Sequence, residues 1–170
     1  MRTGIRYSAA AGFGYPIRIA LHDGGYDVSF DALIEAPRRR VFAVLSDYAH
    51  LGRINPQITS STFTRSPTGT GERVRTVLHS CVWFFCKNLV QVEDVREPDS
   101  STIVARIIPG AGDFSGGTSI WRLESDGAAT RLHYEATRKL NTWRAARGAH
   151  VSIGCAPTRG ARASRRSRTV

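Results

Sequence analysis

Long hydrophobic runs are absent from this sequence. Its 170 residues contain no stretch that approaches the roughly 18 apolar residues a helix needs to cross a bilayer. Near the N-terminus, glycines and arginines interrupt any apolar core of a signal peptide. We therefore expect a protein without a membrane-spanning helix, located in the cytoplasm.

Motifs that bind metals, phosphates or nucleotides are also missing. The five histidines form no HxH or HExxH pattern, and there is no Walker loop, no GxSxG and no GxGxxG after a strand. His79, His133 and Glu135 remain weak candidates for acid–base catalysis, because a carboxyl group inside an apolar cavity can act as a base. The sequence predicts no metal site and no cofactor.

Cysteine is scarce, with only Cys81, Cys86 and Cys155 in the chain. On one straight strand, Cys81 and Cys86 would lie about 16 Å apart, too far for a disulfide. A hairpin turn between them would bring them together. We expect buried free thiols, and since no histidine stands at ligand spacing, we expect no zinc site.

Acidic residues are absent after Glu135. The first 137 residues carry 15 basic and 14 acidic side chains, a net charge of +1, whereas the last 33 carry nine basic ones, beginning with Arg138. Apolar periodicity also stops after Leu140. Residues 141–170 are therefore predicted to form a disordered basic tail, suited to non-specific contact with anionic partners such as RNA, the ribosome or an acidic membrane surface.

Alternating apolar and polar residues fill most of the chain between residues 16 and 140, which we expect to form one domain after an irregular segment 1–15. The candidate strands are residues 16–22, 26–36, 58–65, 72–85, 89–96, 102–108, 118–124 and 130–137. Pro37, followed by Val41, Val44, Leu45 and Tyr48 at helical spacing, predicts one short helix after the first hairpin. The fold class is therefore α+β: a curved antiparallel sheet of about seven or eight strands with a helical insertion.

Aromatic residues suggest a binding wall. The segment 81–86 is apolar on both faces of its strand, so each face must contact a core, a ligand or a partner. Trp83, Phe85, Phe114, Trp121 and Tyr134 are predicted to share one concave face, where they would line a site for a flat apolar molecule. Plain core packing is the alternative for each of them.

The order of these motifs resembles the START-like, helix-grip (SRPBCC) superfamily, in its polyketide cyclase/dehydrase and coenzyme-Q-binding branch. The motifs are Ile34-Glu35-Ala36-Pro37, then Val41-Phe42-Ala43-Val44-Leu45-Ser46-Asp47-Tyr48, Ile54-Asn55-Pro56, Gly112-Asp113-Phe114, Trp121-Arg122-Leu123 and Thr130-Arg131-Leu132-His133-Tyr134-Glu135. The resemblance implies a curved sheet that grips a long C-terminal helix, with a hydrophobic tunnel between them. It also implies that Tyr48 and Ile54 close the mouth of this tunnel.

The resemblance leaves three functions open. The first is binding or carriage of a hydrophobic small molecule, such as a lipid, a quinone or a polyketide-like compound. The second is a cyclase- or dehydratase-type enzyme acting on such a molecule, and the third is an interaction module with a basic tail. Residues 141–170 lack the gripping helix that the family leads us to expect. We expect a one-base shift of the reading frame near codon 140 to restore it.

Overall fold

The computed structural model describes residues 6–10, 16–22, 24–82 and 85–141, and of residues 6–10, 82 and 85 only the backbone. The expectations for Trp83, for the tail from residue 142 and for the gripping helix therefore lie outside the described residues. No helix in the described ranges is long and apolar enough to span a membrane.

Nine strands form one antiparallel sheet in the order β1-β2-β3-β9-β8-β7-β6-β5-β4. The strands are β1 Arg6–Ala10, β2 Pro16–His22, β3 Gly25–Ile34, β4 Ile58–Arg65, β5 Glu72–Val82, β6 Phe85–Asp99, β7 Thr102–Ile107, β8 Phe114–Asp126 and β9 Ala129–Leu140. Between β3 and β4 lie the helix α1 (Arg38–Leu45) and the 3-10 helix η1 (Tyr48–Arg53). This insertion carries the chain from the middle of the sheet to its far edge.

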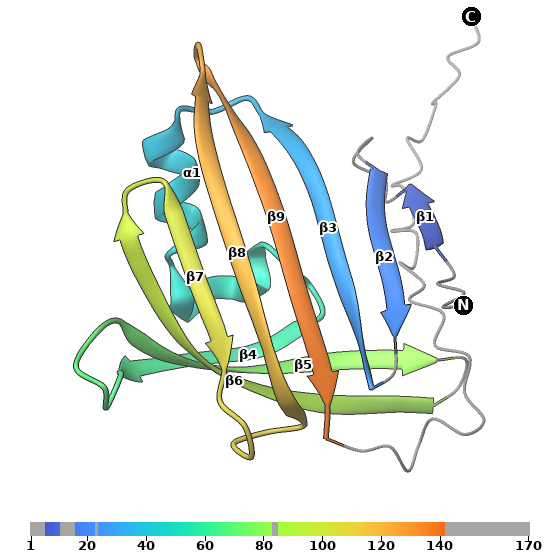
Figure 1. Ribbon diagram of the computed structural model, residues 1–170. Coiled ribbons are helices and arrows are strands. Elements are labelled where there is room, and N and C mark those ends of the chain that lie inside the picture. Colours follow the sequence, from blue (N-terminus) through green and yellow to red (C-terminus); the bar gives the residue numbers. More distant parts are fainter. Residues whose placement is uncertain (1–5, 11–15, 23, 83–84, 142–170) are drawn as a thin grey trace, which may run out of the picture.

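The sheet is strongly bent. In Figure 1, β3, β9 and β8 stand upright, whereas β4, β5 and the first part of β6 cross beneath them, and α1 lies against one side of the upright strands. Direct contacts join α1 to β8 and β9. We call the side of the sheet that packs against α1 the inner face, and the other side the outer face.

The strand pattern follows the prediction closely. The strands β2 and β4 have the bounds that the alternation indicates, and the predicted helical insertion follows the first hairpin. The strand β1 differs, because residues 1–15 were expected to be irregular whereas Arg6–Ala10 pairs with β2. Its sequence RYSAA has little apolar alternation, so only the backbone pairing with β2 defines it.

The helix α1 is shorter and turned differently than its apolar spacing predicts. Pro37 is its N-cap, and Val41 is buried at 6% exposure, as expected. The prediction that Val44 belongs to the apolar face is wrong, because this side chain is 52% exposed. The helix ends at Leu45, and Phe42 and Leu45 supply the packing instead.

The core lies between α1, η1 and the inner face of the sheet. Phe42, Leu45 and Trp121 pack against both of its buried clusters. One cluster contains Tyr48, Val74, Val95, Ile103 and Ala105, and the other contains Val41, Leu123 and Leu132. The two helical elements therefore cover the part of the inner face that carries these clusters.

The hairpin β5–β6 corrects the expectation for the cysteines. Cys81 and Cys86 lie directly opposite each other in its ladder, and a disulfide joins them. Both residues are exposed. The prediction of buried free thiols is therefore wrong. The predicted strand 72–85 spans two strands, because β5 ends at Val82 and Phe85 pairs with Val82 as the first residue of β6.

Candidate ligand-binding face

Three aromatic rings form a continuous wall on the inner face. Phe30 on β3 pairs in register with Tyr134 on β9, which pairs with Trp121 on β8. The ring centroids lie 5.1 Å apart for Phe30 and Tyr134 and 5.0 Å apart for Trp121 and Tyr134, in tilted arrangements. All three side chains are only partly buried. We call these three residues the aromatic wall.

A polar cluster lies beside this wall. Arg138 follows Tyr134 by four residues on β9, and because side chains alternate along a strand, both belong to the inner face. The buried Arg138 guanidinium donates to Glu93 Oε1 at 3.0 Å and to Ser119 Oγ at 2.5 Å. Gln91 connects the two ends of the pair, since its Oε1 accepts from Arg138 Nε at 3.3 Å and its Nε2 donates to Glu93 Oε2 at 2.8 Å.

Arg138 and Glu93 are nearly inaccessible to solvent, at 6% and 7% exposure. Charged groups that are buried in this way are stable only when they are paired. Burial raises the pKa of Glu93 above its ordinary value, while Arg138 and the hydrogen bond from Gln91 act in the opposite direction. We call Arg138, Glu93, Gln91 and Ser119 the polar cluster. It places hydrogen-bonding groups next to an otherwise apolar wall.

Tyrosine hydroxyls border the same face. Burial raises the pKa of Tyr26 and of Tyr134, and nearby Arg138 partly counteracts this rise in both. In η1, burial raises the pKa of Tyr48, and its hydrogen bond to Glu97 Oε1, at 2.5 Å, raises it further. All three phenols therefore hold their protons more tightly in the folded chain than in the unfolded chain.

We expect the free energy of unfolding to fall as the pH rises above about 10, the ordinary pKa of tyrosine. In the unfolded chain, Tyr26, Tyr48 and Tyr134 ionise near that pH, whereas in the folded chain they stay protonated. The three tyrosines therefore contribute fully to the free energy of unfolding at a pH below their pKa in the unfolded chain. This contribution is lost as the pH rises through their pKa in the folded chain. Urea unfolding at several alkaline pH values measures this slope, and Tyr26→Phe should reduce it. An equal slope in both chains would contradict the assignment for Tyr26.

The structure brings together part of the predicted pocket. Trp121 and Tyr134 are in contact, and Tyr48 packs in the same core cluster as Trp121. Phe114 is buried at 3% exposure at the start of β8, whereas Ile54, just after η1, is 44% exposed. Tyr48 is thus the buried first residue of η1, and it packs in the core below this 3-10 helix.

Two further predicted lining residues stay predictions. Trp83 and the side chain of Phe85 lie outside the described part of the chain. Phe85 itself opens β6 and pairs with Val82 at the end of β5.

The predicted acid–base candidates lie on the outer face. His133 Nδ1 is 2.8 Å from Asp31 Oδ1, and Glu135 accepts a hydrogen bond from Arg122 at 2.9 Å. Glu135 does not point inward, because it alternates along β9 with the inward Tyr134. His79 also belongs to the outer face, on β5. A catalytic role for the three stays a prediction, and they do not share a site with the aromatic wall.

Sequence reasoning missed Phe30 and the polar cluster. Phe30 was already part of the predicted alternation of its strand, so the signal was present. Arg138 was counted with the basic tail, which the structure corrects: it is a buried residue of β9, neutralised by Glu93. The continuing alternation from Leu132 through Tyr134 to Arg138 could have shown this.

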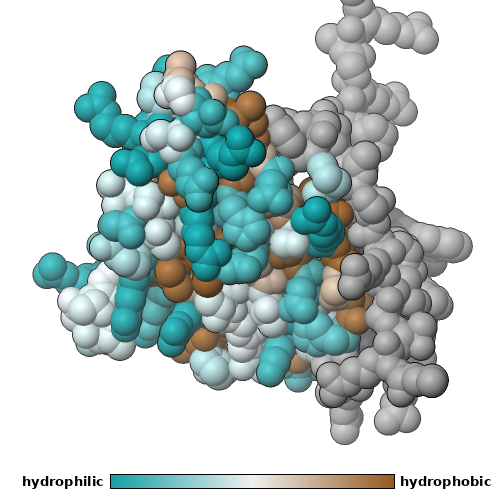
Figure 2. All heavy atoms as spheres, turned by 45° about the horizontal axis from the view of Figure 1, so that its top comes forward, coloured by the Kyte–Doolittle hydropathy of each residue, from teal (hydrophilic) through white to brown (hydrophobic). Residues whose placement is uncertain are grey.

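The outer face carries a cavity of about 690 Å³. Most of the described residues that line it belong to the outer face, among them Arg18, Asp27, Ile120 and Glu135, and none of these described residues has an aromatic ring. On the side of the molecule that Figure 2 presents, apolar residues of the described part form separate patches among hydrophilic side chains. The inner face, where rings and buried polar groups adjoin, is the better candidate for an apolar ligand.

Comparison with models of protein families gives a match over most of the chain. A family model described as polyketide cyclase / dehydrase and lipid transport matches residues 26–156. No curated protein matches the sequence.

Solved structures share the fold. A START superfamily protein from Mycobacterium smegmatis is 18% identical, with a TM-score of 0.57 over 70% of this chain and 79% of that one. A STAR-related lipid transfer protein from Xanthomonas axonopodis is 15% identical, with a TM-score of 0.57 over 81% and 86%. A Streptomyces aromatase/cyclase is 19% identical, with a TM-score of 0.50 over 68% of each chain. These likenesses confirm the predicted helix-grip fold.

Proposed function

Because this chain belongs to the polyketide cyclase/dehydrase and lipid transport family, we propose that it binds and carries a hydrophobic small molecule on the inner face of its sheet. The aromatic wall carries the proposal, since Phe30, Tyr134 and Trp121 adjoin each other and are only partly buried. A lipid, a quinone or a polyketide-like compound has the apolar surface that such a wall would contact.

The polar cluster suggests how such a ligand would be oriented. Its apolar part would lie along the aromatic wall, and a carbonyl or hydroxyl group would approach the hydroxyls of Tyr26 and Tyr134 near Arg138. A small number of placed polar groups on an apolar wall commonly sets the orientation of a ligand. The buried Arg138–Glu93 pair would hold this end rigid.

Catalysis on such a ligand is the second candidate, and Glu93 is the observation that favours it. It is a buried carboxyl group on the inner face whose pKa is raised by burial, a property of many acid–base catalysts. However, Glu93 Oε1 accepts from Arg138 and Oε2 accepts from Gln91. Both oxygens are therefore engaged, and carriage accounts for the face better than catalysis does.

Native mass spectrometry of the full chain, purified from its own host, tests the proposal. We expect a population whose mass exceeds that of the chain by one small molecule, and this molecule should be released under denaturing conditions and extracted into an organic solvent. Detection of the unliganded mass alone, in preparations made by gentle lysis without detergent, would contradict carriage.

A further inference from the structure

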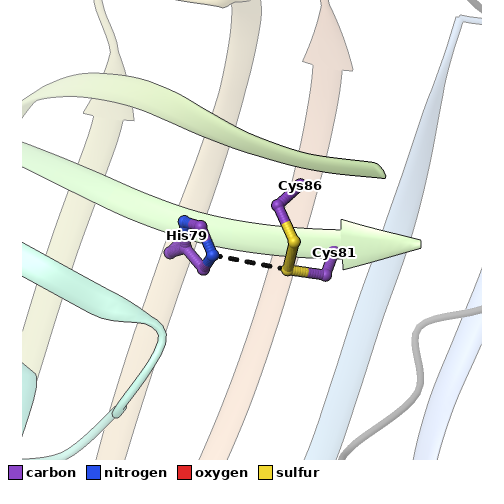
Figure 3. Close-up of side chains that lie close together, drawn as sticks. All are labelled: His79, Cys81 and Cys86. Carbon is purple, nitrogen blue, oxygen red and sulfur yellow. Dashed lines mark hydrogen bonds between the residues drawn. A yellow bond between two sulfur atoms is a disulfide. The ribbon is translucent and has the colours of Figure 1, made fainter. Parts of the chain in front are cut away.

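A histidine and two cysteines converge on the outer face, at the end of the β5–β6 hairpin (Figure 3). Cys81 and Cys86 are joined across the ladder, and His79 lies two residues before Cys81 on β5, with its Nε2 at 3.3 Å from Cys81 Sγ. The one nitrogen and two sulfur atoms all lie within 4.8 Å of one another, and all three residues are exposed.

The imidazole of His79 is held in a defined orientation. Asn88 faces it across the hairpin, and Asn88 Oδ1 lies 2.8 Å from His79 Nδ1. Since an amide oxygen only accepts, Nδ1 is the donor, and in the neutral ring the lone pair of Nε2 faces the sulfur atom. Histidines that bind metals commonly have this arrangement, in which one ring nitrogen donates to an oxygen and the other binds the ion.

We propose that reduction of the Cys81–Cys86 disulfide creates a Zn²⁺ site formed by His79, Cys81 and Cys86. Zinc takes thiolate sulfur at about 2.3 Å and imidazole nitrogen at about 2.0–2.1 Å, so that tetrahedral ligands lie about 3.6–3.8 Å apart. Rotation of the two cysteine side chains on their paired strands gives this spacing. Three protein ligands leave the fourth position open, and because the residues are exposed, this position faces solvent.

Reduction of the disulfide and binding of zinc form a balanced sequence of reactions. Reduction by a phosphine breaks the S–S bond and leaves one thiol on each cysteine, while the phosphine becomes a phosphine oxide with oxygen from water. The same water supplies the two thiol protons. Zinc then displaces these protons and binds the thiolates. The oxidised chain lacks both sulfur ligands, so metal binding depends on the redox state and not on the ligand of the inner face.

Titration with Co²⁺ tests the site, because tetrahedral thiolate-bound cobalt absorbs in the visible and near ultraviolet. The experiment uses the full chain with the substitution Cys155→Ser, so that Cys155 supplies no ligand. This chain is first reduced with a phosphine, which is then removed under anaerobic conditions. We expect one Co²⁺ per chain, displaced by Zn²⁺, and at least about a 100-fold weaker affinity in the oxidised chain. His79→Ala should weaken binding at least as much as Asn88→Ala, for which we expect about a 10–100-fold loss.

The matched control is His50→Ala. His50 is also exposed and also bonds through Nδ1, to Asp47, but it is not one of the residues that converge on the sulfur pair. Its removal should leave cobalt affinity unchanged. Equal affinity in the reduced and oxidised chains would overturn the proposal. Full affinity in a folded His79→Ala chain, checked by circular dichroism, would also overturn it, because the two thiolates alone would then bind the ion.

Discussion

Arg138→Met should lower the free energy of unfolding by about 3–5 kcal/mol, the cost of leaving one partner of a buried ion pair without the other. Arg138 and Glu93 are both nearly inaccessible, and the guanidinium also donates to Ser119 and Gln91. Methionine fills much of the same volume but donates no hydrogen bond. Urea unfolding at neutral pH, followed by circular dichroism, measures the loss.

Two further variants test whether the loss of stability comes from the burial of the Arg138–Glu93 pair. Arg131→Met, on the same strand, removes an exposed pair with Asp126 whose side chains are 60% and 48% accessible, so we expect a loss of no more than about 1 kcal/mol. The double variant Arg138→Met/Glu93→Leu should recover most of the stability, because no buried charge is then left alone. An equal loss from Arg131→Met and Arg138→Met would contradict the burial of the pair.

The energetics of this pair bear on its role. Replacing a buried ion pair by apolar residues is often neutral or even stabilising, so stability alone does not explain why the pair is present. Its position beside the aromatic wall offers another explanation. We infer that the pair orients the polar end of a bound ligand.

The second large effect that we expect is on ligand affinity. Phe30→Leu keeps an apolar side chain on β3 but removes the ring that contacts Tyr134, and we expect about a tenfold weaker affinity for a flat ligand, which is about 1.4 kcal/mol. Leu33→Ala is the control, because it truncates an exposed apolar residue of the same strand on the outer face. Equal affinities in the two variants would contradict a role for the aromatic wall.

Much of the fold could be predicted from alternation alone. A strand with one buried face has a period of two, so β2 and β4 were found with their bounds, and the change to a helical period located α1. The resemblance supplied the bent sheet. The same alternation also placed Phe30 on the buried side of its strand.

The remaining details depend on contacts between distant segments, and the spacing of apolar residues along one strand does not reveal such contacts. Glu135 and Tyr134 are neighbours in sequence, and only the register with β8 shows which one faces α1. Arg138 resembled the basic residues after it, and only Glu93, 45 positions away, distinguishes it. The four residues between Cys81 and Cys86 include no glycine, proline or asparagine, so the sequence contained no local signal for the hairpin or its disulfide.

The most direct test of the account is the emission of Trp121 on ligand addition. Trp83→Phe/Trp143→Phe leaves Trp121 as the one tryptophan of the full chain, and this residue belongs to the aromatic wall. Titration with a ubiquinone analogue, and separately with a long-chain fatty acid, should change its emission in a saturable manner for at least one of the two. Emission that stays flat with both, up to their solubility limits, would contradict the claim that the inner face binds a hydrophobic molecule.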